Sequence, residues 1–245
     1  MIVIIVDFNR TYRGIRTMQY ATWLARQIDV DLIIRAPVYE DLDTCTHAFQ
    51  QLVPYTGSPI VLAPHTPLFS EAGKDEERIF VTPAPSLKEA RQHGIAGKVH
   101  LLFSLDETGG RDILSPALCL PFGDREAALR AGALAMVLGS PLKTIIHAVH
   151  TTYRNSKCSK TDPALAHMSE AAQEVAETLK QSAIAHSVQL RYEVVVEADN
   201  IVDYGIEAAI RRDCGIIIAA CGETLIGGNA EQWVLRSPLP VLVAA

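Results

Sequence analysis

The sequence predicts an α/β fold built on parallel sheets. Short apolar segments alternate with amphipathic helical segments along most of the chain. The apolar segments are continuous rather than alternating in polarity, which is typical of parallel strands covered by helices on both faces. The 245 residues, 49% of them hydrophobic, suffice for one large or two small cores.

The second half shows this alternation most clearly. Its first strand is Leu118 to Phe122, and a helix follows that Asp124 can cap and that Gly139 and Pro141 are expected to end. Further strands are predicted at 143–149 and 189–197, within 213–222 and within 238–245. The helices between them include one with an apolar face, and that face comprises Leu165, Met168, Ala172, Val175, Leu179 and Ala183. Asp199 or Asn200 caps the next helix, so this half predicts a five-stranded parallel sheet with helices on both faces.

The first half starts in the same way and then becomes less regular. A strand at 2–6 ends in Asp7, and a helix, a strand at 30–35 and a helix at 42–52 follow. Weaker strands are expected at 59–63, 78–81 and 98–104, with a short helix at 86–93. The two halves therefore look like a degenerate repeat, with domains at 1–106 and 117–245 joined by a linker at 107–116.

Composition excludes several classes of protein. The net charge is -6 and the basic residues form no stripe, which argues against a nucleic-acid partner. No apolar run approaches the ~20 residues of a membrane span, so no membrane insertion is expected. The N-terminus lacks the charged leader of a signal peptide, and the five cysteines form no Cys-x-x-Cys pair. These features predict a cytoplasmic protein.

The second half resembles the universal stress protein family. The similarity covers 117–245 and rests on the Pro-Phe-Gly-Asp-x-Glu-Ala-Ala start, the Asp-x-Ile-Ile-Ile strand and the chain ending. In that ending, the residues that match the family are Ala230, Glu231, Pro238, Pro240, Val241, Leu242 and Val243. The first half resembles a shortened copy, mainly through Ile4-Ile5-Val6-Asp7-Phe8. The resemblance implies tandem Rossmann-like domains of the adenine nucleotide alpha hydrolase-like kind.

The resemblance also implies where a nucleotide would bind, and this chain departs from that pattern. ATP-binding members carry an Asp at the end of the first strand and a Gly-x-x-Gly loop followed by Gly-Ser or Gly-Thr. Here the second half has Gly123 in place of the Asp, and the stretch that matches the phosphate loop, Ala220 to Gly228, is several residues too short. The first half keeps Asp7 but has Pro64-His-Thr-Pro67 where the glycine turn should be.

Candidate ligand residues are therefore few: Asp7, Gly222, Gly227, Gly228 and Asn229. Asp7 is either a cap for the helix that begins near Thr11 or a nucleotide contact at the carboxyl edge of the sheet. The 227–229 segment is either a helix start capped by Asn229, which the acidic Glu223 favours, or a residual anion site.

Metal and thiol sites are not predicted. His147 and His150 lie three apart in a strand and thus point to opposite faces, so no metal is expected there. His65 lies in a loop, and Cys221 is interpreted as a small residue lining the loop rather than a reactive thiol.

No enzyme signature is present: there is no nucleophile elbow, no Walker lysine loop and no dinucleotide Gly-x-Gly-x-x-Gly. The resemblance then implies a non-catalytic stress-response or regulatory protein with an eroded nucleotide site and no cofactor. One alternative is a protein that still binds ATP or another adenine nucleotide, with slow or no hydrolysis. Another is a regulatory module of a transporter.

The last strand suggests how the protein assembles. In the predicted topology 241–245 lies at the sheet edge, where backbone groups invite a partner strand. The resemblance implies that such edges pair the two halves about a pseudo-twofold axis, with 78–82 as the equivalent edge of the first half. Incomplete pairing would favour a homodimer.

Overall fold

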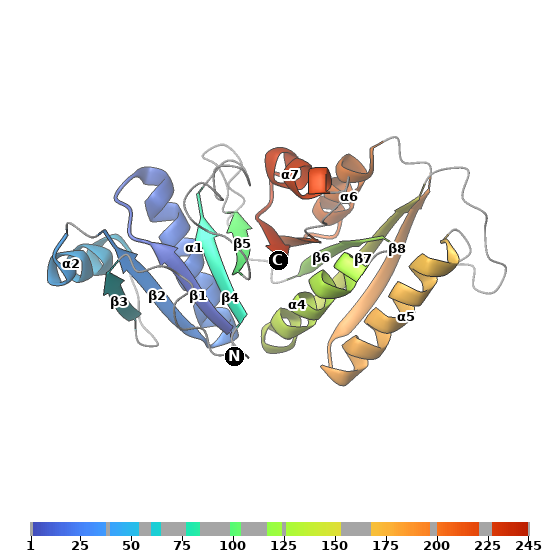
Figure 1. Cartoon of the computed structure of the whole chain (residues 1–245), viewed down its shortest axis with the longest axis horizontal. Coiled ribbons are helices and arrows are strands. Elements are labelled where there is room, and N and C mark those ends of the chain that lie inside the picture. Colours follow the sequence, from blue (N-terminus) through green and yellow to red (C-terminus); the bar gives the residue numbers. More distant parts are fainter. Residues whose placement is uncertain are drawn as a thin grey trace. The chain divides into compact units, whose positions relative to one another are not determined.

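The computed structural model of the chain describes residues 2–37, 40–53, 60–64, 77–83, 99–103, 117–123, 126–152, 168–196, 200–220 and 227–244. The chain divides into two compact units, Met1–Gly110 and Arg111–Ala245. In each unit the described strands form a five-stranded parallel sheet with helices packed on it (Figure 1). The α/β fold predicted from the sequence is therefore confirmed. The predicted linker at 107–116 and short helix at 86–93 lie outside the described residues.

The first unit has the strand order β3-β2-β1-β4-β5. Its elements are β1 (Ile2–Asp7), α1 (Tyr12–Ile28), β2 (Asp31–Ala36), α2 (Leu42–Leu52), β3 (Ile60–Pro64), β4 (Glu77–Thr82) and β5 (Val99–Phe103). β1 is central and almost entirely buried, and α1 packs over β1, β2 and β4. The carboxyl ends of β1 and β2 therefore lie next to each other, with Asp7 in register with Arg35.

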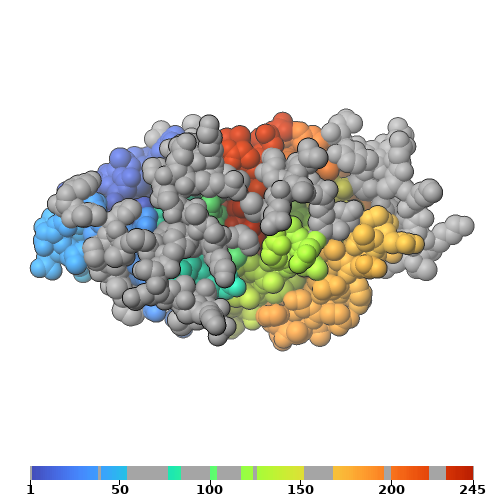
Figure 2. Space-filling view, in the orientation of Figure 1, coloured from blue at the N-terminus to red at the C-terminus, as the bar shows by residue number. Residues whose placement is uncertain are grey.

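The second unit repeats this topology, because its order is β8-β7-β6-β9-β10. Its elements are β6 (Leu118–Phe122), α4 (Glu126–Leu142), β7 (Ile145–Thr152), α5 (Glu170–Ala185), β8 (Gln189–Val196), α6 (Ile201–Arg211), β9 (Ile216–Ala220), α7 (Gly227–Arg236) and β10 (Val241–Ala244). Helix α4 packs with α5, and α6 packs with α7, which covers the sheet with two pairs of helices. Figure 2 shows α5, in yellow and orange, on the outside of this unit. The predicted position of the last strand at the end of this sheet's strand order is confirmed.

The prediction that the segment 78–82 forms an edge strand of the first unit is wrong. The segment at 78–82 belongs to β4, which pairs with β1 on one side and β5 on the other. Its residues Ile79 to Thr82 are all buried, as expected for an interior strand whose two backbone edges are both used. The last strand in the order is instead β5.

Helix α4 also runs further than the sequence suggested. Gly139 does not stop it, because its missing side chain allows close packing: an added Cβ would lie 3.1 Å from both Ile146 and Val188. Pro141 lies inside the last turn. The helix ends at Leu142, because the next residue, Lys143, has a left-handed φ of 50° and the Thr144 amide donates to the Gly139 carbonyl at 3.3 Å.

The predicted start of helix α6 is confirmed, whereas the predicted start of helix α5 is not. Asn200 caps α6, because its side-chain oxygen accepts from the amides of Val202 and Asp203, as expected. Helix α5 begins later than predicted, at Glu170, with Ser169 as its cap. Met168 is therefore buried just before the helix rather than on its apolar face, and Leu165 lies outside the described residues.

Two tyrosines differ in whether their hydroxyl is satisfied. The Tyr20 hydroxyl on α1 is buried and has no hydrogen-bond partner among the described residues, while its ring stacks on Trp23 at 5.5 Å. The Tyr192 hydroxyl on β8 donates to the Ala176 carbonyl. Burial raises the pKa of both phenols, so both stay protonated near neutral pH.

We expect removal of the two hydroxyls to have opposite effects on stability. Tyr20→Phe should stabilise the fold by about 1 kcal/mol, because it removes a polar atom buried without a partner. Tyr192→Phe, the matched control, should destabilise it by about 1 kcal/mol, because it leaves the Ala176 carbonyl without this donor. Urea denaturation followed by circular dichroism measures both. Equal losses in the two variants would contradict the difference assigned to the hydroxyls.

Candidate functional site

The described residues form a pocket of about 450 Å³ at the carboxyl ends of β1 and β2. Phe8, Asn9, Arg10 and Thr11 line it from the loop after β1, and Pro37 and Glu40 from the loop after β2. In open parallel sheets, ligands bind at this edge, at the point where neighbouring strands lead to opposite sides. In this unit the strand order reverses between β1 and β4, and the loop after β1, which lines the pocket, borders that point. The pocket is therefore the candidate site.

Local hydrogen bonds hold the loop after β1 against the start of α1. Asn9 Oδ1 accepts from the Thr11 amide at 2.8 Å, and Thr11 Oγ1 caps the helix by accepting from the Gly14 amide at 3.1 Å. Gly14 allows this approach, since an added Cβ would lie 2.4 Å from Asn9 Cβ and 2.7 Å from the Asn9 backbone oxygen. The loop therefore has a defined shape before any ligand arrives.

Asp7 forms an ion pair with Arg35. It does not cap helix α1, which was one of the two roles predicted for it. Arg35 Nε and Nη2 donate to Asp7 Oδ1 and Oδ2 at 2.6 and 2.8 Å. The arginine side chain is only 6% exposed and lies over the Phe80 ring at 4.8 Å, whereas the Asp7 side chain is 39% exposed. The helix cap is Thr11. Both carboxylate oxygens of Asp7 are thus already engaged by a cation in the wall of the sheet.

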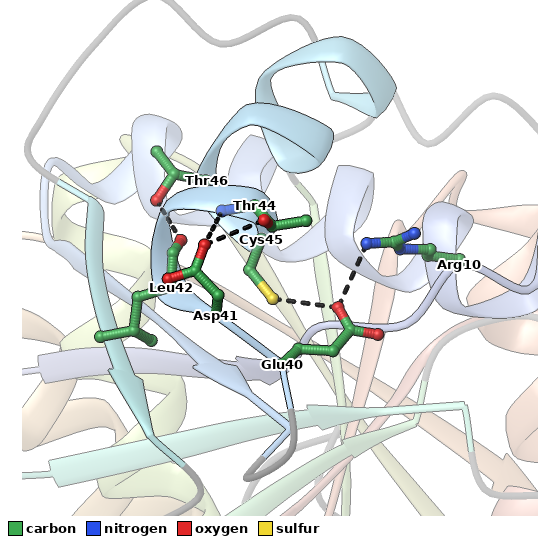
Figure 3. Close-up of polar contacts among 7 residues, drawn as sticks. All are labelled: Arg10, Glu40, Asp41, Leu42, Thr44, Cys45 and Thr46. Atoms are coloured by element: carbon green, nitrogen blue, oxygen red, sulfur yellow. Dashed lines mark hydrogen bonds and ion pairs between the residues drawn. The ribbon is translucent and has the colours of Figure 1, made fainter.

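A second ion pair joins two residues that line the pocket, Arg10 and Glu40 (Figure 3). Arg10 Nη2 donates to Glu40 Oε2 at 3.2 Å, and the Cys45 thiol donates to the same oxygen at 3.2 Å. Burial, with the hydrogen bond to Glu40, raises the pKa of Cys45 to about 11, so this thiol is a donor and not a nucleophile at neutral pH. Arg10 also lies over the Phe8 ring at 5.5 Å.

Asp41, the residue after Glu40, caps the N-terminus of helix α2. Asp41 Oδ2 accepts from the Thr44 amide and the Thr44 hydroxyl, each at 2.9 Å (Figure 3). These hydrogen bonds from Thr44 lower the pKa of Asp41. Because the cap fixes the first turn of α2, Cys45 lies where its thiol meets the Glu40 carboxylate.

Among the described residues at the equivalent edge of the second unit, three aromatic side chains lie together. Phe122, at the end of β6, contacts the rings of His150 at 5.3 Å and Tyr192 at 6.0 Å. His150 Nδ1 lies 3.1 Å from the Phe122 carbonyl oxygen. Gly123 follows, and no described atom lies within 4 Å of the Cβ it lacks. The glycine is therefore not required by packing, and the described residues that end this strand, Phe122 and Gly123, carry no carboxylate.

The sequence favoured Asn229 as the cap of the last helix, and the structure differs from this. Helix α7 begins at Gly227, so Asn229 lies in its first turn rather than at the cap position. Gly228 is in the same turn, and Gly222 and Cys221 lie outside the described residues. The anion site proposed for these glycines therefore remains a prediction. Asp7 belongs to the other unit.

His147 and His150 are both buried in β7, three residues apart. Burial, with the charges of Arg212 and Arg191, lowers the pKa of His147. In the described part of the chain no three His, Cys, Asp or Glu side chains form a group that could hold a metal ion. His65 lies outside that part.

Sequence reasoning missed Arg10, Arg35 and Glu40. A signal for Arg35 was present, because a buried cation in an apolar strand needs a partner, and Asp7 ends the neighbouring strand. No comparable signal marks Glu40, which reaches Arg10 across 30 positions of sequence.

No protein-family model matches the chain, and no curated protein matches it. Solved structures do. A universal stress protein from Archaeoglobus fulgidus is 10% identical, with a TM-score of 0.58 over 99% of this chain and 97% of that one. A functionally unknown protein from Pseudomonas aeruginosa is 11% identical, with a TM-score of 0.57 over 99% of this chain and 92% of that one. The resemblance to universal stress proteins is thus confirmed at the level of the fold.

Among the helices that the structure describes, none has the length and apolar character needed to cross a bilayer.

Proposed function

We propose that this chain is a universal stress protein-like regulatory protein that is not a catalyst and whose nucleotide site is eroded. The fold shared with the Archaeoglobus fulgidus protein supports the class. The eroded site is inferred from the strand ends of both units. Residue 123, in the position of the family's carboxylate, is glycine, and the carboxylate of the first unit is bound to Arg35.

The observation that carries this proposal is the Asp7–Arg35 pair. A strand-end carboxylate can hold a ligand only through lone pairs that are not already used. Arg35 approaches both oxygens of Asp7 in a fork, which is the strongest arrangement for this pair of groups. A nucleotide would therefore have to compete with an internal cation.

A second candidate function keeps adenine-nucleotide binding in the first unit. The pocket beyond Asp7 favours it, because it lies at the ligand-binding edge of the sheet and is about 450 Å³. Glu40 argues against a triphosphate there, since its carboxylate is paired with Arg10, the cation that lines the same pocket.

We further propose that the protein works in the cytoplasm and assembles as a homodimer through the region of β10, with the two halves paired about a pseudo-twofold axis. Support comes from the position of β10 at the end of the strand order of its unit.

Calorimetric titration with magnesium and ATP tests the proposed function. We expect no binding in the micromolar range, because Asp7 is bound to Arg35, position 123 is glycine and no complete phosphate loop is present in the sequence. Mass spectrometry of small molecules released from denatured protein is the control for a ligand retained during purification. A dissociation constant in the low micromolar range for ATP would overturn the proposal.

A further inference from the structure

Strand β8 is an open edge of the sheet in the second unit. It lies at the end of that unit's strand order and pairs with β7 along all eight of its residues, and no described strand pairs with its other side (Figure 1). About half of its backbone N–H and C=O groups therefore point away from the sheet. Proteins protect such edges with short strands, prolines, bulges or charges. β8 contains no proline and its unbroken register with β7 leaves no bulge, so its protection has to come from charge.

The charges beside this edge come mainly from arginine. Arg191 belongs to β8, and Arg211 and Arg212 end helix α6 next to the strand. Both arginines of α6 donate to Glu193 on β8: Arg211 Nη2 donates to Oε1, and Arg212 Nε donates to Oε2 at 2.9 Å. Because side chains alternate between the two faces of a strand, Arg191 lies on the same face as Glu193. Three guanidinium groups thus share one carboxylate, and both of its oxygens are in use.

The excess positive charge at this edge is accessible. The side chains of Arg211 and Arg212 are 56% and 47% exposed. Arg191 is exposed as well and has no hydrogen bond or ion pair among the described residues. The buried His147 of β7, in register with Arg191, responds to this charge: burial, and then Arg212 and Arg191, lower its pKa, and each arginine acts more strongly than the opposing Glu193. The electrostatic field at this edge is therefore positive.

This charge selects among the chains that could add to the edge. A second copy of this chain would bring further arginines to it, and the Glu193 carboxylate of that copy would be bound by its own Arg211 and Arg212. Like charges that face each other across two strands destabilise the pairing. An extended segment with acidic side chains at alternate positions instead places carboxylates against the exposed guanidinium groups, while its backbone completes the hydrogen bonding of β8.

We propose that β8 is a docking edge for an extended acidic segment of a partner protein, which adds to the sheet as a further strand and is selected by Arg191, Arg211 and Arg212. On the opposite face of β8, which Tyr192 turns toward α5, Leu190 and Val194 are half-buried. The acidic residues of the partner segment should therefore alternate with apolar ones. This inference goes beyond the proposed function and does not depend on the nucleotide site, so the result of the ATP titration does not decide it.

Fluorescence anisotropy of labelled peptides with the full chain tests the proposal. The first peptide matches the length of β8 and alternates Glu with Val, the second has Lys in place of Glu, and the third keeps Glu but has Pro in place of its central Val residues. We expect the first to bind and the others to bind at least about tenfold more weakly, because Lys meets like charge and Pro lacks the backbone donor. Arg191→Glu should weaken binding of the first peptide by at least about tenfold. The matched control is Arg26→Glu, an exposed arginine in the last turn of α1 in the other unit, with a change of less than about twofold.

Hydrogen exchange locates the bound peptide: it should slow exchange of the amides of β8 and leave those of β10, at the other end of the unit's strand order, unchanged. Absence of binding, equal affinities for the Glu and Lys peptides, equal affinities for the Glu and Pro peptides, or an unchanged affinity in Arg191→Glu overturns the proposal. Protection of β8 that rises with protein concentration in the absence of peptide assigns the edge to a second copy and also overturns it. Thermal melting checks that Arg191→Glu is folded, and Arg191→Gln, which removes the charge without reversing it, should show a smaller loss of affinity.

Discussion

Leu242→Lys is expected to unfold the second unit, at a cost of more than about 4 kcal/mol. Leu242 lies in β10, pairs with Ile218 and has no exposed surface. A lysine there would bury an ammonium group in a region of apolar side chains, with no acidic partner in its strand.

Leu235→Lys on α7 is the matched control, because the Leu235 side chain is 54% exposed. We expect its effect to stay within about 0.5 kcal/mol. Urea denaturation followed by circular dichroism measures both variants. Similar midpoints for the two would show that Leu242 is not in the core. Because the Leu242 side chain is buried, its loss of stability does not by itself test assembly, and the mass of the wild-type protein by light scattering tests the proposed homodimer.

The sequence predicted those parts of the fold that depend on local patterns. Continuous apolar runs such as Ile2 to Val6 identified strands, and the Asn200 side chain identified a helix start. Both signals act over a few residues and follow from backbone geometry. The repeat of one topology in two units could be inferred from the order of such signals alone.

Features that depend on contacts between distant segments could not be predicted. Gly139 looked like a helix stop and is instead a packing position against Ile146 and Val188. The segment at 78–82 looked like an edge strand, because nothing in its composition shows that both of its sides are paired. The candidate site has the same character. Asp7 was identified, but its partner Arg35 depends on strand register, and Glu40 depends on the loop after β2.

The free energy of unfolding should fall much more when Asp7 is removed from the Asp7–Arg35 pair than when Arg35 is removed. Asp7→Ala leaves the Arg35 guanidinium almost fully buried without its carboxylate, and we expect a loss of about 2 to 3 kcal/mol. Arg35→Met leaves a carboxylate that is 39% exposed and can be hydrated, and methionine retains much of the packing against Phe80. We therefore expect a loss of about 1 kcal/mol or less for Arg35→Met.

The double variant is the decisive measurement, because it removes both charges together. If the cost of Asp7→Ala comes from an uncompensated buried cation, then adding Arg35→Met to it should restore stability rather than reduce it further. The free energies of unfolding from urea titrations of the wild type, the two single variants and the double variant give the coupling energy. Additive losses would show that the pair is not coupled and would remove the physical basis for regarding Asp7 as occupied. The same variants are needed to interpret ligand binding. A loss of binding in Asp7→Ala has to be compared with the double variant, because the unpaired Arg35 cation is present in the first and absent from the second.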